Sequence, residues 1–249
     1  MAAGGASFDM NLKHINMKVF IAGGTSGIGL ATAKLLANGG AQVIITGRNA
    51  SKLEQAMAEL PSTAQGYCVD AANVDEQKAV LGKVGAIDHL VLALSGAKGV
   101  GLLKDLDFAV LRQGFEEKFF LHLQILQAAL PYLSANASVT FITAVSGHAR
   151  FPGIAGIGAI NGALETVVPI LAKELQPVRV NAVSPGVIDS PWWSWMPEEA
   201  RGQTFDQYAQ MTPVKRVGKP EDVAGMIGQV IGNGFLTGQV ITVDGGMGL

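Results

Sequence analysis

Short apolar runs rich in valine and isoleucine alternate with longer helical patterns along nearly the whole chain of 249 residues. Runs that are apolar on both faces are typical of strands covered by helices on either side. The predicted strands are Lys18–Ala22, Gln42–Thr46, Gln65–Val69, His89–Leu94, Val139–Thr143, Val178–Val183 and Gln239–Val243. The predicted helices are Ile28–Asn38, Ser51–Leu60, Val74–Val84, Phe108–Leu133, Ile154–Leu175 and Pro220–Ile231. Because strands separated by helices form parallel β-α-β units, this pattern predicts an α/β fold with a doubly wound, seven-stranded parallel sheet.

The pattern continues without interruption, so we expect a single domain over residues 1–249. No linker, charge run, repeat or low-complexity segment divides the chain. Two helical stretches, Phe119–Leu133 and Phe151–Leu164, carry no charged residue. A helix that is apolar on nearly all sides needs burial beyond one face. We therefore expect a subunit interface here and a homodimer or homotetramer.

The composition excludes several classes of partner. With 18 basic and 20 acidic residues, the chain gives no reason to expect nucleic-acid binding. The single cysteine, Cys68, supplies neither an internal disulfide nor a zinc site, so no metal is expected, and its apolar surroundings predict a buried side chain. Met1–Lys13 lacks the pattern of a secretory signal, and no apolar stretch of about 18 residues predicts a membrane span. These features favour a soluble, cytoplasmic protein with a small-molecule substrate.

A glycine-rich turn follows the first predicted strand and precedes the first helix. It reads Ala22, Gly23, Gly24, Thr25, Ser26, Gly27, Ile28, Gly29. Backbone N–H groups and the helix dipole at such a turn bind a pyrophosphate, and glycine lets the backbone approach it. An ordinary tight turn is the alternative, but the position in the chain favours a dinucleotide site. After the second strand stands Arg48 instead of an acid; its guanidinium suits a 2′-phosphate, which favours NADP(H), the alternative being a solvated surface arginine.

With these motifs the chain resembles the short-chain dehydrogenase/reductase family over nearly its whole length, which implies a Rossmann-type fold. Gly23, Gly27 and Gly29 match the family's glycine motif, and Asp70 matches the acid that members place against the adenine ring. The segment Asn181–Ser190 matches the one that holds the nicotinamide end. The resemblance implies cofactor contacts there from Pro185, Gly186, Ile188 and Ser190, and it implies a substrate lid at about residues 190–215.

The resemblance fails at the catalytic positions. The family uses a Ser, a Tyr, a Lys and an Asn, and the matching positions here hold Ala144, Ile157, Asn161 and Lys118. Family members donate a proton from the Tyr, and losing a positioned acid typically removes about 10²–10⁴ in rate. The family's own mechanism therefore does not operate in this chain.

Three residues are candidates for a relocated donor. Lys118 would bring an ammonium to the cleft from the opposite helix, although a lysine at a helix start often snorkels to solvent. His148 and Ser146 follow the fifth strand, on the loop that flanks the substrate in this family; His148 suits acid chemistry near neutral pH, the alternative being an ordinary loop histidine.

Two hypotheses remain for the function. In the first, the protein is an oxidoreductase with a non-standard proton donor, acting on a small apolar carbonyl or alcohol. In the second, it is a catalytically inactive NADP(H)-binding protein that serves as a sensor or interaction partner. The tryptophans Trp192, Trp193 and Trp195 in the predicted lid suggest an apolar ligand, unless they serve only to pack the lid or a subunit contact.

Overall fold

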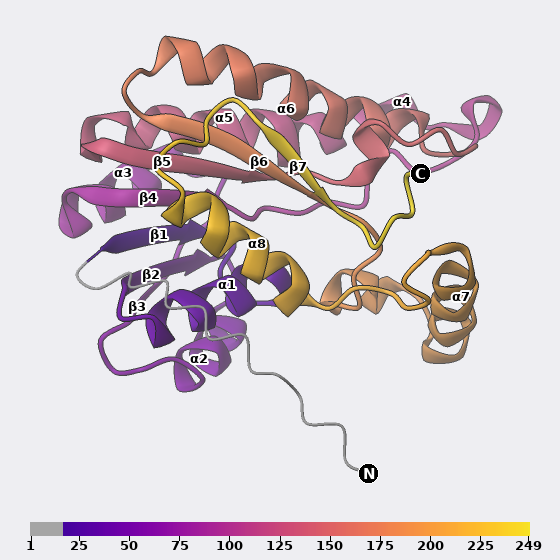
Figure 1. The fold of residues 1–249 in the computed structure, drawn as a ribbon, viewed down its shortest axis with the longest axis horizontal. Coiled ribbons are helices and arrows are strands. Elements are labelled where there is room, and N and C mark those ends of the chain that lie inside the picture. The colour runs from indigo at the N-terminus through magenta and orange to yellow at the C-terminus, as the bar shows by residue number, and fades with distance from the viewer. Residues whose placement is uncertain (1–16) are drawn as a thin grey trace.

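Seven parallel strands form the sheet of the computed structural model, which describes residues 17–249 (Figure 1). In chain order they are β1 (Lys18–Ala22), β2 (Gln42–Gly47), β3 (Gln65–Cys68), β4 (Ile87–Leu92), β5 (Leu133–Ile142), β6 (Arg179–Pro185) and β7 (Val240–Val243). Their order across the sheet is β3-β2-β1-β4-β5-β6-β7, and every neighbouring pair is parallel. The predicted doubly wound sheet is confirmed. Met1–Lys13, where the sequence predicts no secretory signal, lies outside the described residues.

Helices cover both faces of this sheet (Figure 1). They are α1 (Gly27–Asn38), α2 (Ala50–Ala58), α3 (Val74–Val84), α4 (Phe108–Gly114), α5 (Leu121–Ala129), α6 (Ala155–Glu174), α7 (Glu198–Met211) and α8 (Pro220–Gly232). Helices α3, α5 and α6 contribute to one buried apolar cluster, and α1, α2 and α8 contribute to the other. The sheet therefore separates two cores.

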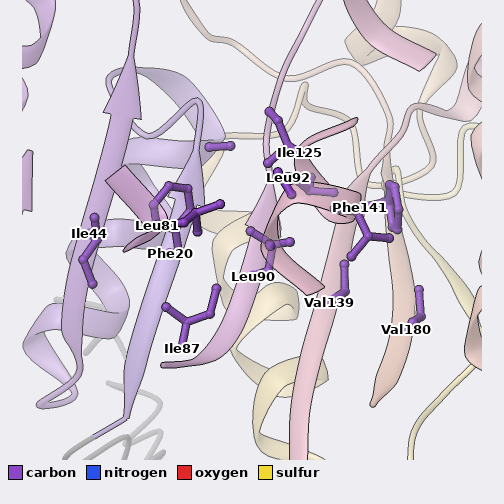
Figure 2. Close-up of a cluster of buried hydrophobic side chains, with 14 of the residues drawn as sticks. Phe20, Ile44, Leu81, Ile87, Leu90, Leu92, Ile125, Val139, Phe141 and Val180 are labelled. Carbon is purple, nitrogen blue, oxygen red and sulfur yellow. The ribbon is translucent and has the colours of Figure 1, made fainter. Parts of the chain in front are cut away.

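Strand β1 shows how the sequence builds both cores. Phe20 points into the cluster under α3, α5 and α6, whereas its neighbours Val19 and Ile21 point into the other cluster. Figure 2 shows the first cluster, in which Phe20 and Phe141 are fully buried together with leucine, isoleucine and valine side chains. Burial of each such side chain contributes about 1.5–3 kcal/mol to the stability of the fold. The central strands are apolar on both faces because helices cover both faces of the sheet.

The predicted helix Phe108–Leu133 is wrong in its continuity. The structure divides it into α4, a π-helical segment η2 (Phe115–Phe120), α5 and a short 3₁₀ turn η3 (Leu130–Tyr132). A π-helical turn adds a residue to the helical repeat, which a 3.6-residue pattern does not reveal. Strand β5 begins at Leu133, six residues before the predicted start at Val139, because the chain leaves the 3₁₀ turn directly into the strand.

The prediction that Cys68 is buried is also wrong, because its side chain is exposed. Cys68 ends β3, which is an edge strand paired only with β2. Successive side chains of a strand point to opposite sides, and here the next residue, Val69, is the buried one.

Helix α6 is long and apolar enough to span a membrane when judged only by length and composition, and 39% of the relevant window is buried. In this domain it packs against β6 and η2. Its apolar character thus serves, at least in part, the packing on the sheet.

The order of the strands changes direction between β1 and β4. In open α/β sheets, ligands bind in the crevice beyond the carboxyl ends of the strands at this switch point. The loops that follow β1, β4, β5 and β6 are therefore the place to examine for function.

Candidate cofactor cleft and proton-donor cluster

The glycine turn after β1 is held against its neighbours by close backbone contacts. The N–H groups of Gly23 and Gly24 both donate to the carbonyl oxygen of Thr46, at 3.1 Å. Gly23 has a φ of +85°, and a Cβ there would lie 2.7 Å from the carbonyl oxygen of Ala93. A Cβ at Gly29 would lie 2.2 Å from the carbonyl oxygen of Gly23. Glycine is required at both positions for the turn to close onto α1.

The N-terminus of α1 is left open by this turn. Ser26 precedes the helix but its side chain does not cap it, so N–H groups of the first turn, which includes Ile28, remain available to a ligand. Gly27 has a φ of +52°, and a Cβ there would find its nearest neighbour, Ser190 Cβ, only at 3.6 Å. Ser190 thus lies against the first turn of α1, next to a positive helix end of the kind that suits a diphosphate.

Arg48 and Asp70 lie at the ends of the next two strands. Gly47, the last residue of β2, packs so closely on the glycine turn that a Cβ there would lie 2.5 Å from Thr25 Cγ2. Arg48 follows at once and is exposed, next to the turn that carries Thr25. Asp70 follows β3, is exposed, and accepts a 3.0 Å hydrogen bond from the N–H of Ala72.

The segment after β6 lies against the glycine turn. Pro185 ends the strand, and Gly186 packs so tightly that a Cβ there would lie 2.8 Å from Asp244 Cα. Ile188 is buried, and its carbonyl oxygen accepts a 3.0 Å hydrogen bond from Trp193 Nε1. Since Ser190 faces Gly27, the structure brings this segment and the glycine turn together.

The positions of the family's Tyr and Lys lie one helical turn apart on α6. Ile157 is buried and offers no polar atom. Asn161 is fully buried; its Nδ2 donates to Ser146 Oγ and to the carbonyl oxygen of Ile157, both at 3.0 Å. Its Oδ1 is buried and has no hydrogen-bond partner among residues 17–249. Ser146, one of the predicted catalytic residues, is thus a direct partner of Asn161.

Lys118 lies in η2 and is only 6% exposed. Burial lowers the pKa of its ammonium from 10.5 to about 8, while the negative charge of Glu165 acts in the opposite direction. Within the described part of the chain, its ammonium makes no hydrogen bond or ion pair. The residue as a whole is buried, but Lys118 Nζ is not among the fully buried side-chain atoms that lack a partner in the described residues, so a lysine that snorkels to solvent remains the alternative.

The sequence analysis missed Glu165, on which three elements converge. Its Oε1 accepts hydrogen bonds from Thr143 Oγ1 at 2.9 Å and from Ser184 Oγ at 2.8 Å, at the ends of β5 and β6. Its Oε2 lies 3.3 Å from Nδ1 of His148, and the Glu165 side chain is 13% exposed. A signal was present, because Glu165 is the single charged residue between Arg150 and Lys173.

His122 lies one turn after Lys118 and is fully buried. Its Nδ1 lies 2.6 Å from the carbonyl oxygen of Lys118 and its Nε2 lies 3.2 Å from that of Leu92. Burial, and next the charge of Lys118, lower the pKa of this imidazole to about 4. At neutral pH the ring is therefore uncharged and carries one N–H, so it donates to only one of these two carbonyl oxygens.

Two of the three predicted catalytic residues, Ser146 and His148, therefore contact one face of α6. Ser146 contacts Asn161, and His148 contacts Glu165. The negative charge of Glu165 raises the pKa of Lys118. The His148 side chain is 41% exposed, so it borders solvent, whereas Lys118 is inside.

A surface hollow of about 820 Å³ also borders this cluster, separate from the glycine turn. Its lining includes Ser146, Gly147, Arg150, Phe151 and Glu165. No group of three or more potential metal-ligating side chains occurs in the described ranges.

The tryptophans of the predicted lid pack mainly on each other and on α7. Trp193 makes an edge contact with Phe205 and a tilted contact with Tyr208, at centroid distances of 5.5 and 6.3 Å. Trp192 donates from Nε1 to the carbonyl oxygen of Gly96 at 3.4 Å, whereas Trp195 is 60% exposed. Packing thus accounts for Trp193, and Trp195 remains open to solvent.

A doubly wound sheet with an open glycine turn at its switch point defines a dinucleotide-binding α/β protein of the Rossmann type. A family model described as "Enoyl-(Acyl carrier protein) reductase" matches residues 22–248. The chain belongs to the short-chain dehydrogenase/reductase family, whose members are oxidoreductases that use a nicotinamide cofactor.

Individual relatives agree with this assignment. The 3-oxoacyl-[acyl-carrier-protein] reductase FabG of Thermotoga maritima is 33% identical over 243 residues, covering 91% of this chain and 96% of that protein. Mouse dehydrogenase/reductase SDR family member 4 is 28% identical and covers 93% of this chain and 87% of its own length.

Solved structures extend the similarity to three dimensions. A small-chain dehydrogenase in complex with NADPH superposes with a TM-score of 0.82 at 27% identity, over 93% of this chain and 98% of that one. A Brucella melitensis member described as a glucose/ribitol dehydrogenase gives a TM-score of 0.87 at 27% identity, over 95% and 98% of the two chains.

Proposed function

We propose that the protein is an NADP(H)-dependent oxidoreductase that acts on a small apolar carbonyl or alcohol, with Lys118 as its proton donor. The observation that carries this proposal is the burial of the Lys118 ammonium. The family's Asn position holds Lys118 and its Lys position holds Asn161, so the two residue types are exchanged between facing helical segments. A cation is thereby kept, but it comes from η2 instead of α6.

The cofactor site fits a phosphorylated dinucleotide. The open N-terminus of α1 suits the diphosphate, and the exposed Arg48 next to Thr25 suits the 2′-phosphate of NADP(H). Asp70 is proposed to contact the adenine ring. Pro185, Gly186, Ile188 and Ser190 are proposed to hold the nicotinamide end, as the corresponding segment does in the family.

The chemistry divides between the cofactor and the chain. When bound, the nicotinamide supplies the hydride that reduces the carbonyl carbon. The Lys118 ammonium donates a proton to the carbonyl oxygen, so one N–H bond breaks, one O–H bond forms and a neutral amine remains until solvent reprotonates it. A pKa of about 8 suits this task, because an acid works best when its pKa lies near the working pH. Ile157 and Ala144 take no part, since neither side chain carries a polar atom.

The second candidate is a catalytically inactive NADP(H)-binding protein that acts as a sensor or interaction partner. The observation that favours it is the apolar, buried Ile157 at the Tyr position. In that case the Lys118 charge would serve cofactor binding alone, and no turnover would depend on it.

Cofactor binding is tested first, by tryptophan fluorescence titration with NADPH and NADH. We expect tighter binding of NADPH, and we expect Arg48→Gln to weaken NADPH binding about tenfold or more while leaving NADH binding nearly unchanged. The control is Arg112→Gln, which makes the same charge change at an exposed position on α4. Equal affinity of the wild type for both cofactors would refute the proposed specificity.

Catalysis is tested with NADPH and a panel of apolar aldehydes and ketones. We expect Lys118→Met to lower kcat by about 10²-fold or more, with the exposed Lys173→Met as control. Turnover that survives both Lys118→Met and His148→Gln would end the idea of a relocated donor. Cofactor binding without turnover on any substrate, by contrast, would favour the second candidate.

Assembly is the remaining part of the proposal. Members of this family commonly oligomerise, and exposed apolar side chains on the two uncharged stretches, Phe120, Leu130 and Phe151, support a homodimer or homotetramer. We propose a cytoplasmic location, and sedimentation analysis of the purified protein would test the assembly.

A further inference from the structure

We propose that Glu165 is a positioning residue for the nicotinamide end of the cofactor site, because its carboxylate ties α6 to the ends of β5 and β6, where the loops of the site begin. The inference rests on the proposed function in one respect, namely that the segment after β6 holds the nicotinamide end. It assigns Glu165 no contact with the cofactor and no part in proton transfer.

The carboxylate of Glu165 joins segments that are distant in the sequence. Its Oε1 accepts hydrogen bonds from Thr143 Oγ1 at 2.9 Å and from Ser184 Oγ at 2.8 Å, and its Oε2 lies 3.3 Å from His148 Nδ1. Thr143 is only 3% exposed and Ser184 is fully buried, so both hydroxyls are shielded from water. Hydrogen bonds to an ionised acceptor are stronger than those between neutral groups. The carboxylate therefore holds the two strand ends against α6.

Both hydroxyls stand directly before the loops on which the proposed function depends. Ser184 comes immediately before the turn at residues 185 and 186, which is proposed to hold the nicotinamide end. Thr143 comes immediately before Ala144, at the family's Ser position, and its N–H donates to the carbonyl oxygen of Val183 at 3.0 Å. A displacement of either hydroxyl would thus be passed on to a loop of the site.

The turn at residues 185 and 186 is also held by backbone contacts to β7 and the residue after it. The N–H of Gly186 donates to the carbonyl oxygen of Val243 at 3.0 Å, and a Cβ at Gly186 would lie 2.8 Å from Asp244 Cα. From the side of α6, Ser184 Oγ has no hydrogen bond other than that to Glu165 within residues 17–249. Loss of the carboxylate would therefore remove the contact from α6 and leave those from β7.

The loop after β5 reaches Glu165 because a glycine lies at the contact. A Cβ at Gly147 would lie 2.8 Å from Glu165 Oε2 and 3.0 Å from the backbone nitrogen of Gly162. The absence of a side chain at Gly147 lets this loop lie against α6 and brings the ring of His148 to Oε2. One carboxylate thus fixes the loops after both β5 and β6.

The test separates the two ends of the cofactor. Adenosine 2′,5′-bisphosphate carries the adenosine and the 2′-phosphate of NADPH but no nicotinamide, so a defect at the nicotinamide end weakens the binding of NADPH alone. Glu165→Leu removes both acceptor oxygens. We expect it to raise the dissociation constant of NADPH about tenfold and to change that of the bisphosphate less than about twofold, as measured by titration calorimetry of the full-length protein.

Matched variants show whether the hydrogen bonds are responsible. Glu165→Gln keeps an acceptor oxygen for both hydroxyls and should bind NADPH within about twofold of the wild type. Ser184→Ala removes one hydrogen bond, should raise the dissociation constant of NADPH about threefold, and provides the same test if Glu165→Leu does not fold. The control is Glu174→Leu, at an exposed position on the same helix, which should bind both ligands as the wild type does.

Hydrogen exchange of the protein without ligand gives a second readout. We expect faster exchange at residues 145–148 and 186–190 in Glu165→Leu than in the wild type, and equal exchange in the glycine turn at residues 22–29. An exchange pattern in Glu165→Leu that matches the wild type would overturn the inference.

The binding outcomes separate this inference from the proposed function. An equal loss of affinity for NADPH and the bisphosphate would overturn the inference, because it indicates general damage to the fold, and so would unchanged NADPH binding in both Glu165→Leu and Ser184→Ala. Full activity of Lys118→Met would refute the proposed proton donor and leave this inference standing. If the wild type bound neither ligand, the proposed cofactor site would fail, and the exchange measurement alone would decide the role of Glu165.

Discussion

Burial of the Lys118 ammonium should lower the free energy of unfolding of the protein. Its pKa is lowered from 10.5 to about 8 in the folded protein, and burial is the main cause. At 1.36 kcal/mol per pKa unit, this difference corresponds to about 3 kcal/mol of destabilisation wherever the amine is protonated in both states. Replacing Lys118 with methionine, which is similar in length and apolar, should therefore stabilise the protein by up to about 3 kcal/mol at pH 7.

The sign of the pH dependence follows from proton uptake. Between pH 8 and 10.5 the unfolded chain holds a proton on Lys118 that the folded chain has lost, so the stability of the wild type rises with pH over this window. The methionine variant has no such proton. Its advantage should therefore shrink above pH 8, to about 1 kcal/mol at pH 10.

Urea unfolding of the wild type and of Lys118→Met at pH 7 and pH 10, followed by circular dichroism, measures both quantities. Lys173→Met, at an exposed position on α6, should change the stability by less than about 0.5 kcal/mol at either pH. The reasoning would be refuted if Lys118→Met were less stable than the wild type at pH 7, or if its advantage did not change with pH.

Three further perturbations test other parts of the structure. The wild type should lose about 3 kcal/mol of unfolding free energy between pH 6.5 and 4, because the neutral His122 ring takes up a proton on unfolding. In His122→Gln this loss should be absent, which urea midpoints at pH 7 and 4.5 would show. Arg179→Met should cost about 2–3 kcal/mol in thermal melts, since its guanidinium donates to three backbone carbonyls around the end of α8, whereas the exposed Arg112→Met should cost little. Gly29→Ala should weaken NADPH binding more than tenfold, because the added Cβ would lie 2.2 Å from a carbonyl oxygen of the glycine turn. The control is Gly225→Ala, where a Cβ meets nothing within 4 Å, and this variant should bind NADPH as the wild type does.

The arrangement of the sheet could be predicted because its signals are local. The central strands are apolar on both faces and the crossovers contain helices, so the order of elements leaves few topologies. The glycine turn could be placed for the same reason, since it directly joins β1 to α1.

The features that could not be predicted depend on contacts between distant segments. The π-helical turn around Lys118 adds one residue to the helical repeat, and a pattern read at 3.6 residues per turn does not reveal it. Cys68 is exposed because β3 lies at the edge of the sheet. The strand order that places β3 there cannot be deduced from the residues next to Cys68 in the sequence. Glu165 was missed because the comparison with the family drew attention to the substituted positions, whereas Glu165 lies four positions after Asn161 on α6 and contacts Thr143, Ser184 and His148.

The substitutions at 118 and 161 make physical sense only as a pair. Lysine at both positions would place two cations in one buried cleft, and asparagine at both would leave none. With Lys118 and Asn161 the charge is kept, and the amide of Asn161 uses its Nδ2 to hold Ser146 and its own helix. Its Oδ1 stays without a partner in the described residues, and a buried acceptor of this kind costs about 1–3 kcal/mol. A buried ammonium and an unsatisfied amide oxygen within one cluster are both unfavourable for folding, and such costs tend to persist where a site has a function. On the proposed role of Lys118, both costs belong to the proposed chemistry, although the residues that define the family's catalysis are gone.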